Sequence, residues 1–272
     1  MVLINGISGD KVSVSDRGLQ YGDGVFETIA YRGGSPEFLE QHITRLLNGC
    51  RILHINFGQI DDLRAELEGV FKTLDSDSTV IKITITRGVG GRGYFSDNSA
   101  IPTRIIATYS YPIYPEGYQV DGVTLRFCEQ TLSVNRRLAG IKHMNRLEQV
   151  LARNEWSDPA IAEGIMSNEE GSIIECTMSN IFVVADNVLT TPLVTQAGIA
   201  GVMRGQIIQL ATRSGISVEE RAISRQQLAQ ADEVFICNSI IGVWPVSGIT
   251  TTIYSIGLIT QFIQKSLSEL KK

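Results

Sequence analysis

Residues 138–147 read Leu-Ala-Gly-Ile-Lys-His-Met-Asn-Arg-Leu and set Lys142 among small and apolar neighbours. An amine in such surroundings loses part of its hydration, which disfavours the ammonium form and frees the lone pair to attack a carbonyl. A lone lysine is more often a solvated surface residue. Further along the chain, however, come a carboxylate, Glu175, and a glycine-containing loop at residues 198–204 that leads into a helix. An amine, an acid and an anion-binding loop together indicate a site for a small phosphorylated molecule.

The loop is the anion-binding part of this hypothesis. Its two glycines, Gly198 and Gly201, let the backbone approach a ligand, and the first N–H groups of a helix are unpaired donors at a positive dipole end. A plain junction between a loop and a helix would show the same pattern. Glu175 lies between Ile174 and Cys176, where a carboxylate needs a partner such as a protonated pyridine nitrogen. An exposed glutamate at a strand end is the alternative.

Other polar positions fit the same ligand. Arg45 stands beside Leu46 in a predicted helix and is suited to bind a phosphate through two hydrogen bonds, although such an arginine is often a snorkelling surface residue. Asn238 and Ser239 follow a predicted strand, where loops carry function. Taken with Lys142 and Glu175, these residues are typical of a pyridoxal phosphate site.

Residues 88–93 match GxGxxG after a predicted strand. A dinucleotide site also needs a helix that opens at the third glycine, and the residues that follow lack helical periodicity. We therefore predict either a hairpin loop or an active-site loop, in which Arg87, Arg92 and Tyr94 are suited to bind a substrate that carries carboxylates.

The composition is that of a globular protein. The chain has 272 residues, 43% of them hydrophobic and 19% charged, and a net charge of −5. The acidic balance argues against nucleic acid or an anionic membrane as partner. No apolar run approaches the ~20 residues of a spanning helix, and the N-terminus lacks the regions of a signal peptide. We expect a cytoplasmic protein with reduced, buried cysteines, and no metal site because the histidines show no HExxH pattern.

The elements are mixed α and β in two units instead of regular βαβ repeats. We predict an N-terminal α/β domain at residues 1–113, a linker at 114–118 and a C-terminal domain at 119–272, with a crevice between them as the natural place for a ligand. The predicted strands are residues 2–4, 11–14, 24–31, 79–87, 103–109, 122–128, 162–166, 181–184, 217–221 and 233–236. The predicted helices are residues 43–53, 60–74, 144–156, 202–213 and 255–270.

Taken together, these segments resemble the fold-type IV pyridoxal phosphate enzymes, which include branched-chain and D-amino-acid aminotransferases and aminodeoxychorismate lyases. The resemblance covers essentially the whole chain and is carried by residues 16–28, 42–46, 138–149, 175–180 and 231–235. Within the group, residues 87–94 and 138–149 are more similar to the lyases. The resemblance implies two mixed α/β domains with the active site in the crevice between them, in a homodimer.

The resemblance also implies roles for individual residues. Lys142 would join the cofactor covalently, and Glu175 would pair with its ring nitrogen. The phosphate would be bound by Arg45, by the main chain of Val202 and Met203, and by Ser239. Asn238 stands where some relatives have glycine, which leaves its role open. Residues proposed to hold the substrate are Arg92, Tyr94 and Tyr109.

The implied activity is that of a carbon–oxygen lyase in folate biosynthesis, which converts aminodeoxychorismate into 4-aminobenzoate and pyruvate. The alternative is a branched-chain or D-amino-acid aminotransferase that uses the same lysine. Where aminotransferase relatives place a tyrosine shortly after the lysine, this chain has Asn145 and Arg146. A non-enzymatic domain with purely structural loops is a third reading, and it predicts a colourless protein.

Overall fold

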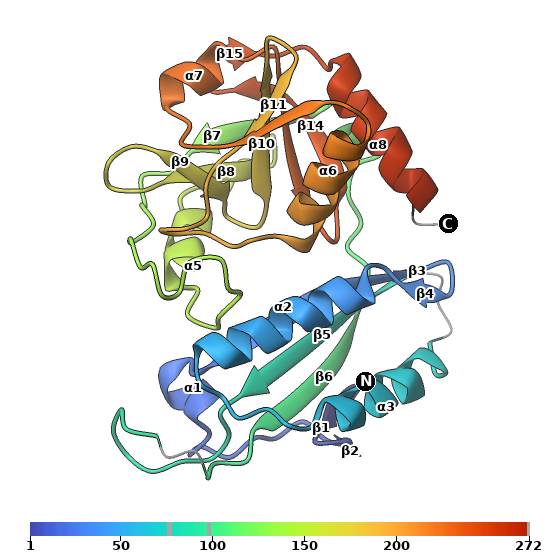
Figure 1. Ribbon diagram of the computed structural model, residues 1–272, viewed down its shortest axis with the longest axis vertical. Coiled ribbons are helices and arrows are strands. Elements are labelled where there is room, and N and C mark those ends of the chain that lie inside the picture. Colours follow the sequence, from blue (N-terminus) through green and yellow to red (C-terminus); the bar gives the residue numbers. More distant parts are fainter. Residues whose placement is uncertain (75–77, 97–98, 271–272) are drawn as a thin grey trace. The chain divides into compact units, whose positions relative to one another are not determined.

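The computed structural model describes residues 1–74, 78–96 and 99–270, and it divides this chain into two compact units, each with its own sheet (Figure 1). The first unit comprises residues 1–112 and 141–145, and the second comprises residues 113–140 and 146–272. The segment that carries Lys142 therefore belongs to the first unit, although the second unit surrounds it in the sequence.

In the described part of the first unit, six antiparallel strands pair in the order β2-β1-β6-β5-β3-β4. The strands are β1 (Val2–Ile4), β2 (Ile7–Ser8), β3 (Gly24–Arg32), β4 (Ser35–Pro36), β5 (Ser78–Thr86) and β6 (Thr103–Ser110). The helices are α1 (Arg17–Tyr21), α2 (Leu39–Ile52) and α3 (Ile60–Phe71).

The core of this unit lies between the sheet and helices α2 and α3. Side chains alternate along a strand, so the odd-numbered residues of β3 and β5, such as Ile29 and Ile83, point to one face. They pack against residues at helical spacing on α2 and α3, among them Leu46 and Leu67. Glu27 has the same parity and is fully buried, so a charged group lies within this apolar layer.

The second unit contains, in its described residues, a sheet of nine strands in the order β12-β11-β10-β13-β14-β7-β8-β9, with β15 paired to β14. The strands are β7 (Val123–Phe127), β8 (Ile161–Ser167), β9 (Ile173–Cys176), β10 (Asn180–Ala185), β11 (Val188–Thr191), β12 (Ser217–Glu220), β13 (Glu233–Asn238), β14 (Gly242–Ile249) and β15 (Thr252–Ile253). The helices are α4 (Gly117–Val120), α5 (Leu147–Arg153), α6 (Val202–Arg213), α7 (Arg225–Ala229) and α8 (Leu258–Leu270).

Strand pairing in this unit brings the predicted functional segments together. Strand β9 pairs with β8, so that Glu175 lies opposite Met166. Strand β10 pairs with β13, so that Asn180 lies opposite Cys237. The end of β13, and with it Asn238, is therefore adjacent to the turn that joins β9 and β10.

Most predicted elements are confirmed within one to three residues, but one strand is wrong. Residues 11–14 form no strand, and Val14 is 78% exposed. The alternation of apolar and polar residues in this segment therefore does not correspond to a buried strand face. The helix predicted at 144–156 is shorter, since α5 spans Leu147–Arg153. Its apolar residues Leu147, Val150 and Leu151 are exposed, and its buried residues are Gln149 and Ala152.

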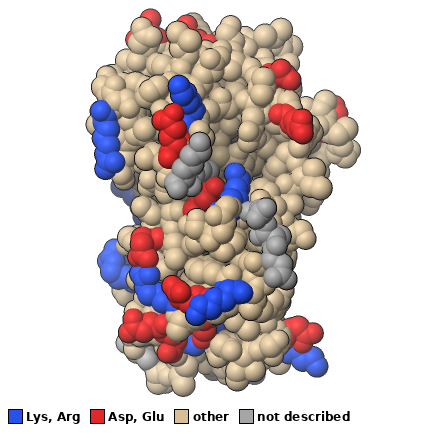
Figure 2. All heavy atoms as spheres, turned by 90° about the vertical axis from the view of Figure 1, so that its right-hand side faces the viewer, with Lys and Arg blue, Asp and Glu red and all other residues tan. Residues whose placement is uncertain are grey.

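On the face drawn in Figure 2, acidic and basic side chains are interspersed among uncharged ones. Within the described residues, no helix is both long enough and apolar enough to cross a bilayer.

Candidate active site

The backbone around Lys142 runs along the start of β3 in the first unit. Phe26 donates its N–H to the carbonyl of Lys142 at 3.0 Å, and Met144 donates to the carbonyl of Gly24 at 2.9 Å. A side chain at Gly24 would not fit, because its Cβ would lie 2.7 Å from the Met144 sulfur and 2.5 Å from the Ile85 carbonyl oxygen. The glycine in this strand therefore permits the close approach that holds the lysine segment.

The Lys142 side chain is half-buried, with Nζ 4.5 Å from the centre of the Phe26 ring. An aromatic face attracts an ammonium group and shields it from water. Burial lowers the pKa of nearby His42; the hydrogen bond and the charge of Glu27 oppose this, while the charges of Arg45 and Lys142 add to it. The charge of Lys142 therefore contributes to the lowered pKa of His42 in the first unit.

Arg45 is held by Glu27, which the sequence analysis did not identify. Arg45 Nε donates to Glu27 Oε1 at 2.7 Å, Arg45 Nη2 donates to Oε2 at 2.5 Å, and His42 Nδ1 lies 2.6 Å from Oε2. Burial alone would raise the pKa of Glu27, but the charge and hydrogen bonds of Arg45, with those of His42, hold it below its ordinary value. Arg45 is thus oriented by a buried carboxylate and is not a snorkelling surface residue.

Glu175 is buried in the second unit, 3% exposed, on β9. Its Oε2 accepts the N–H of Ile199 at 2.8 Å. Gly198 has φ +83°, and a Cβ there would lie 3.3 Å from Glu175 Oε2, so a glycine allows the loop to close over the carboxylate. Burial lowers the pKa of Arg146, and the charges of Glu175 and Glu148 oppose this change.

Two main-chain hydrogen bonds join the glycine loop to Gly140 before helix α6 begins. Gly140 donates its N–H to the carbonyl of Gly198 at 2.9 Å, and Ala200 donates to the carbonyl of Gly140 at 3.0 Å. Gly201 caps α6, and a Cβ at this position would lie 2.0 Å from Asn180 Oδ1. Because a glycine cap has no side chain to bond the first helical N–H groups, this helix start suits an anion.

Asn238 connects the turn between β9 and β10 with the backbone that follows β13. Its Nδ2 donates to the Met178 carbonyl and to Ser179 Oγ, both at 3.2 Å. Its Oδ1 accepts the N–H groups of Ile240 at 2.8 Å and Ile241 at 2.9 Å. The amide of Asn238 is therefore engaged in holding backbone, and Ser239 follows it directly in the chain.

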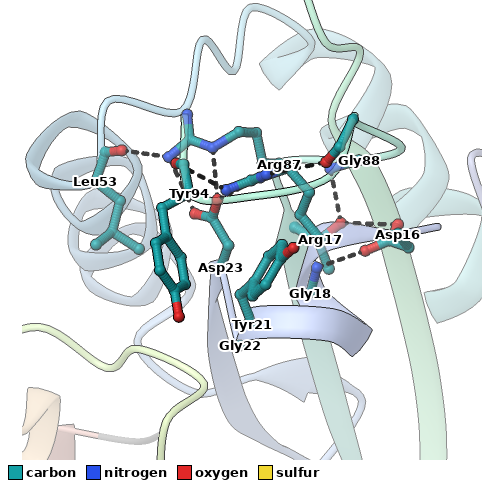
Figure 3. Close-up of polar contacts among 12 residues, drawn as sticks. Asp16, Arg17, Gly18, Tyr21, Gly22, Asp23, Leu53, Arg87, Gly88 and Tyr94 are labelled. Carbon is teal, nitrogen blue, oxygen red and sulfur yellow. Dashed lines mark hydrogen bonds and ion pairs between the residues drawn. The ribbon is translucent and has the colours of Figure 1, made fainter. Parts of the chain in front are cut away.

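The loop at residues 88–94 is anchored from within the first unit (Figure 3). Asp23 Oδ2 accepts Arg17 Nε at 3.0 Å and Arg87 Nε at 2.7 Å, and Arg17 also donates to the carbonyls of Gly93 at 2.9 Å and Tyr94 at 3.2 Å. Arg87 further donates to the carbonyls of Leu53 and His54. The guanidinium of Arg87 therefore holds parts of the first unit together, a role that differs from the expected binding of a substrate carboxylate.

The residues predicted to hold the substrate are not all brought together. Arg92 and Tyr94 are exposed on the same loop, and no helix opens there in the described residues 91–96 and 99–102, as predicted for a loop that does not lead into a helix. Tyr109 pairs with Val80 near the far end of β6, whereas this loop joins β5 to β6 after Thr86. Tyr109 lies six positions along the strand from Thr103 at the loop end, a distance of about 20 Å.

Comparison with known proteins gives the family. The family model for class IV amino-transferases matches residues 24–249. The chain belongs to this family. It is 38% identical to an aminodeoxychorismate lyase of Vibrio harveyi over 98% of this chain and 100% of that protein. It is 31% identical to a putative branched-chain-amino-acid aminotransferase of Methanocaldococcus jannaschii over 96% of this chain and 91% of that protein.

Among solved structures, the chain is similar to the 4-amino-4-deoxychorismate lyase of Pseudomonas aeruginosa, with a TM-score of 0.95 and 42% identity over 99% of this chain and 98% of that chain. The fold, with its two sheets and mixed α/β composition, is that of the fold-type IV pyridoxal phosphate enzymes.

Each unit, taken by itself, contains residues whose chemistry fits that cofactor. The first unit supplies an amine against an aromatic ring and an arginine fixed by a buried carboxylate. The second unit supplies the buried carboxylate of Glu175. A cation nearby, such as a protonated ring nitrogen, would stabilise the charged form of this carboxylate. It also supplies a helix start capped by Gly201, where a larger residue would fill the space beside Asn180.

Proposed function

We propose that the chain is a pyridoxal phosphate-dependent aminodeoxychorismate lyase that forms 4-aminobenzoate and pyruvate for folate biosynthesis. The observation that carries the proposal is full-length similarity to two lyases of this name, at 38% and 42% identity, above the 31% for the aminotransferase. The residues after Lys142, which are Asn145 and Arg146 instead of a tyrosine, favour the same choice.

The proposal gives the cofactor-binding roles to residues already described. Lys142 Nζ would join the cofactor covalently, and the Glu175 carboxylate would hold a proton on the ring nitrogen. Ser239, Asn238 and the main chain of Val202 and Met203 would bind or support the phosphate with Arg45. When bound, pyridoxal phosphate supplies an electron sink for the carbon that bears the substrate amine.

Lys142 is then the residue that moves the proton. With its amine free, Lys142 Nζ would act as the general base that removes the hydrogen from the amine-bearing carbon of the substrate. The bond between the neighbouring ring carbon and the enolpyruvyl oxygen breaks, the ring becomes aromatic, and the released enol takes up a proton to give pyruvate. The atoms of the substrate are all found in 4-aminobenzoate and pyruvate, so no water or second amino acceptor is consumed.

We propose that Arg92 and Tyr94 bind the substrate carboxylates; both are exposed on a loop in which Arg17 holds the carbonyls of Gly93 and Tyr94. A guanidinium binds a carboxylate through two parallel hydrogen bonds, which gives direction as well as affinity. Tyr109 completes the proposed set, although it lies near the other end of β6. We further propose a cytoplasmic homodimer, as expected for the fold.

The test is a product assay with the purified holoenzyme and aminodeoxychorismate, in the absence of any 2-oxo acid. The proposal predicts equal amounts of pyruvate and 4-aminobenzoate, and it predicts neither product from Lys142→Ala. The second candidate is a branched-chain or D-amino-acid aminotransferase, favoured by the 31% identity to such a protein. Amino transfer to a 2-oxo acid without pyruvate release would favour that candidate and contradict the lyase.

A further inference from the structure

Glu163 is a buried acid that has no part in the reaction described above. It lies on β8 and is 2% exposed. Among the described residues, no lysine or arginine forms an ion pair with it. A carboxyl group in such a place is tolerated only if its oxygens accept hydrogen bonds. The identity of its donors therefore indicates what it does.

The donors lie mostly in the turn that follows Glu175. Glu163 Oε1 accepts the N–H of Gly164 at 3.0 Å and the hydroxyl of Thr177. Oε2 accepts the N–H of Met178 at 3.0 Å and the hydroxyl of Ser179 at 3.2 Å. We name residues 177–179 the Glu175 turn; the bond from Cys176 N–H to the Ser179 carbonyl, at 2.7 Å, closes it.

The same turn is connected to the loop after β13. Ser179 Oγ contacts Glu163 on one side and receives a hydrogen bond from Asn238 Nδ2 on the other, at 3.2 Å. Asn238 Oδ1 in turn accepts the N–H groups of Ile240 and Ile241. A continuous chain of hydrogen bonds thus runs from Glu163 through the Glu175 turn to the backbone around Ser239.

We propose that Glu163 is a positioning residue, which fixes the Glu175 turn and the loop around Ser239 relative to each other and thereby sets cofactor affinity. The inference rests on the proposed function, because Glu175 and Ser239 are taken there to hold the ring nitrogen and the phosphate. Glu163 itself is covered by protein and acts through Thr177, Met178, Ser179 and Asn238. Supporting hydrogen bonds of this kind hold binding residues in productive geometry.

Glutamine cannot replace Glu163, although it has the same shape. Each carboxyl oxygen accepts a main-chain N–H, from Gly164 at Oε1 and from Met178 at Oε2. A carboxylate satisfies both donors, and so does a protonated carboxyl, because its hydroxyl oxygen keeps a lone pair. An amide nitrogen has no lone pair to offer. In either orientation of the amide, one backbone N–H must therefore turn away, and the turn shifts with it.

Glu233→Gln is a matched control in the same unit. Glu233 is also buried and also accepts two main-chain N–H groups, from Ile259 at 3.2 Å and Thr260 at 2.8 Å, together with the Thr260 hydroxyl. These donors lie at the start of α8, away from the Glu175 turn in sequence and in hydrogen bonding. Both variants lose the same kind of acceptor, but only Glu163→Gln changes the Glu175 turn.

The experiment measures the dissociation constant for pyridoxal phosphate by stripping each purified protein and titrating the cofactor back while its visible absorbance is followed. We expect Glu163→Gln to bind about ten-fold more weakly than the wild type, and Glu233→Gln to stay within about two-fold despite a comparable loss of thermal stability. Equal affinity of Glu163→Gln and the wild type, or equal weakening in both variants, would overturn the positioning role.

Ser179→Ala keeps the test decisive if Glu163→Gln does not fold. It removes the hydroxyl that joins Glu163 to Asn238, and we expect cofactor binding to weaken about three-fold or more. Unchanged affinity in this variant would contradict the proposal. The failure of the proposed function can be told apart from the failure of the positioning role. A wild-type chain that binds no cofactor would overturn both. A wild-type chain that binds the cofactor, with variants of the same cofactor affinity, would overturn the positioning role alone.

Discussion

Glu27 is the residue on which the orientation of Arg45 depends. Both its oxygens face the Arg45 guanidinium, and the ion pair is buried, with side-chain exposures of 12% for Arg45 and 1% for Glu27. We expect Glu27→Gln to lower the free energy of unfolding at neutral pH by about 3–5 kcal/mol, because it removes the buried carboxylate that pairs with the largely buried guanidinium of Arg45. Urea unfolding followed by circular dichroism measures this loss.

Glu40→Gln is the control for that substitution. Glu40 pairs with Arg64 by two hydrogen bonds of 2.6 and 2.7 Å, but this pair lies at the surface, where solvent screens it. A loss in Glu40→Gln as large as that in Glu27→Gln would show that burial is not what makes the Glu27 pair important.

Glu163 gives a pH dependence of stability with a definite sign. Burial raises the pKa of Glu163 above its ordinary value of 4.5, and its hydrogen bonds from Thr177, Gly164, Met178 and Ser179 oppose the rise without cancelling it. Between 4.5 and the folded pKa, the native state keeps a proton that the unfolded state has released. The contribution of Glu163 to stability is therefore full below about pH 4.5 and declines as the pH rises through the folded pKa.

The measurement is the difference in unfolding free energy between the wild type and Glu163→Gln across this pH range. Glutamine does not titrate, so the subtraction removes the contributions of other groups. We expect the advantage of the wild type to shrink as the pH rises from 4.5. A difference that grows with pH would mean that the carboxyl group is ionised more easily in the folded protein than in water.

At this scale the sequence indicates the residues that are proposed to carry chemistry, but not the residues that support them. Lys142 and Glu175 stand out because charged groups interrupt apolar segments. Glu27 and Glu163 interrupt apolar strands in the same way, but their partners lie on α2 and in the turn before β10, and such pairings exist only in the folded chain. One signal in the sequence could have identified this cluster. Glu27 is a charged residue at a core-facing strand position, and His42 and Arg45 lie one helical turn apart in the following helix.

At the scale of elements, the start of α6 has little room for a larger residue. A Cβ at Gly201 would lie 2.0 Å from Asn180 Oδ1, so Gly201→Ala must displace Asn180 or the first turn of the helix. We expect a destabilisation of about 1–3 kcal/mol together with weaker cofactor binding. Thermal unfolding and cofactor titration measure the two effects.

Gly205 in the same helix provides the comparison. No heavy atom lies within 4 Å of a Cβ at this position, so alanine fits without a shift. Gly205→Ala should stabilise the protein by about 0.5–1 kcal/mol through the higher helix propensity of alanine, with cofactor affinity unchanged. A loss of cofactor affinity in Gly205→Ala would indicate that any change in α6 disturbs the site, and would remove the special role of its first turn.

The elements that were predicted well are those with a buried face. Strands β3, β5 and β6 and helices α2 and α3 alternate or repeat their apolar residues because one side packs into the core. Strand β14 was missed since Pro245 and Gly248 interrupt its pattern, and β9 was missed because it is short and buried throughout. The Lys142 segment was assigned to the C-terminal part of the chain by its position in sequence, whereas its hydrogen bonds to β3 place it with the first unit.

For the whole molecule, the proposed function depends on one covalent attachment, that of pyridoxal phosphate to Lys142. The most direct test reduces the purified, coloured protein with borohydride, digests it, and locates the modified peptide by mass spectrometry. We expect the cofactor adduct on Lys142 and on no other lysine, and we expect Lys142→Ala to lose both the adduct and the visible absorbance. An adduct on a different side chain, or a wild-type protein that carries none, would contradict the proposed function.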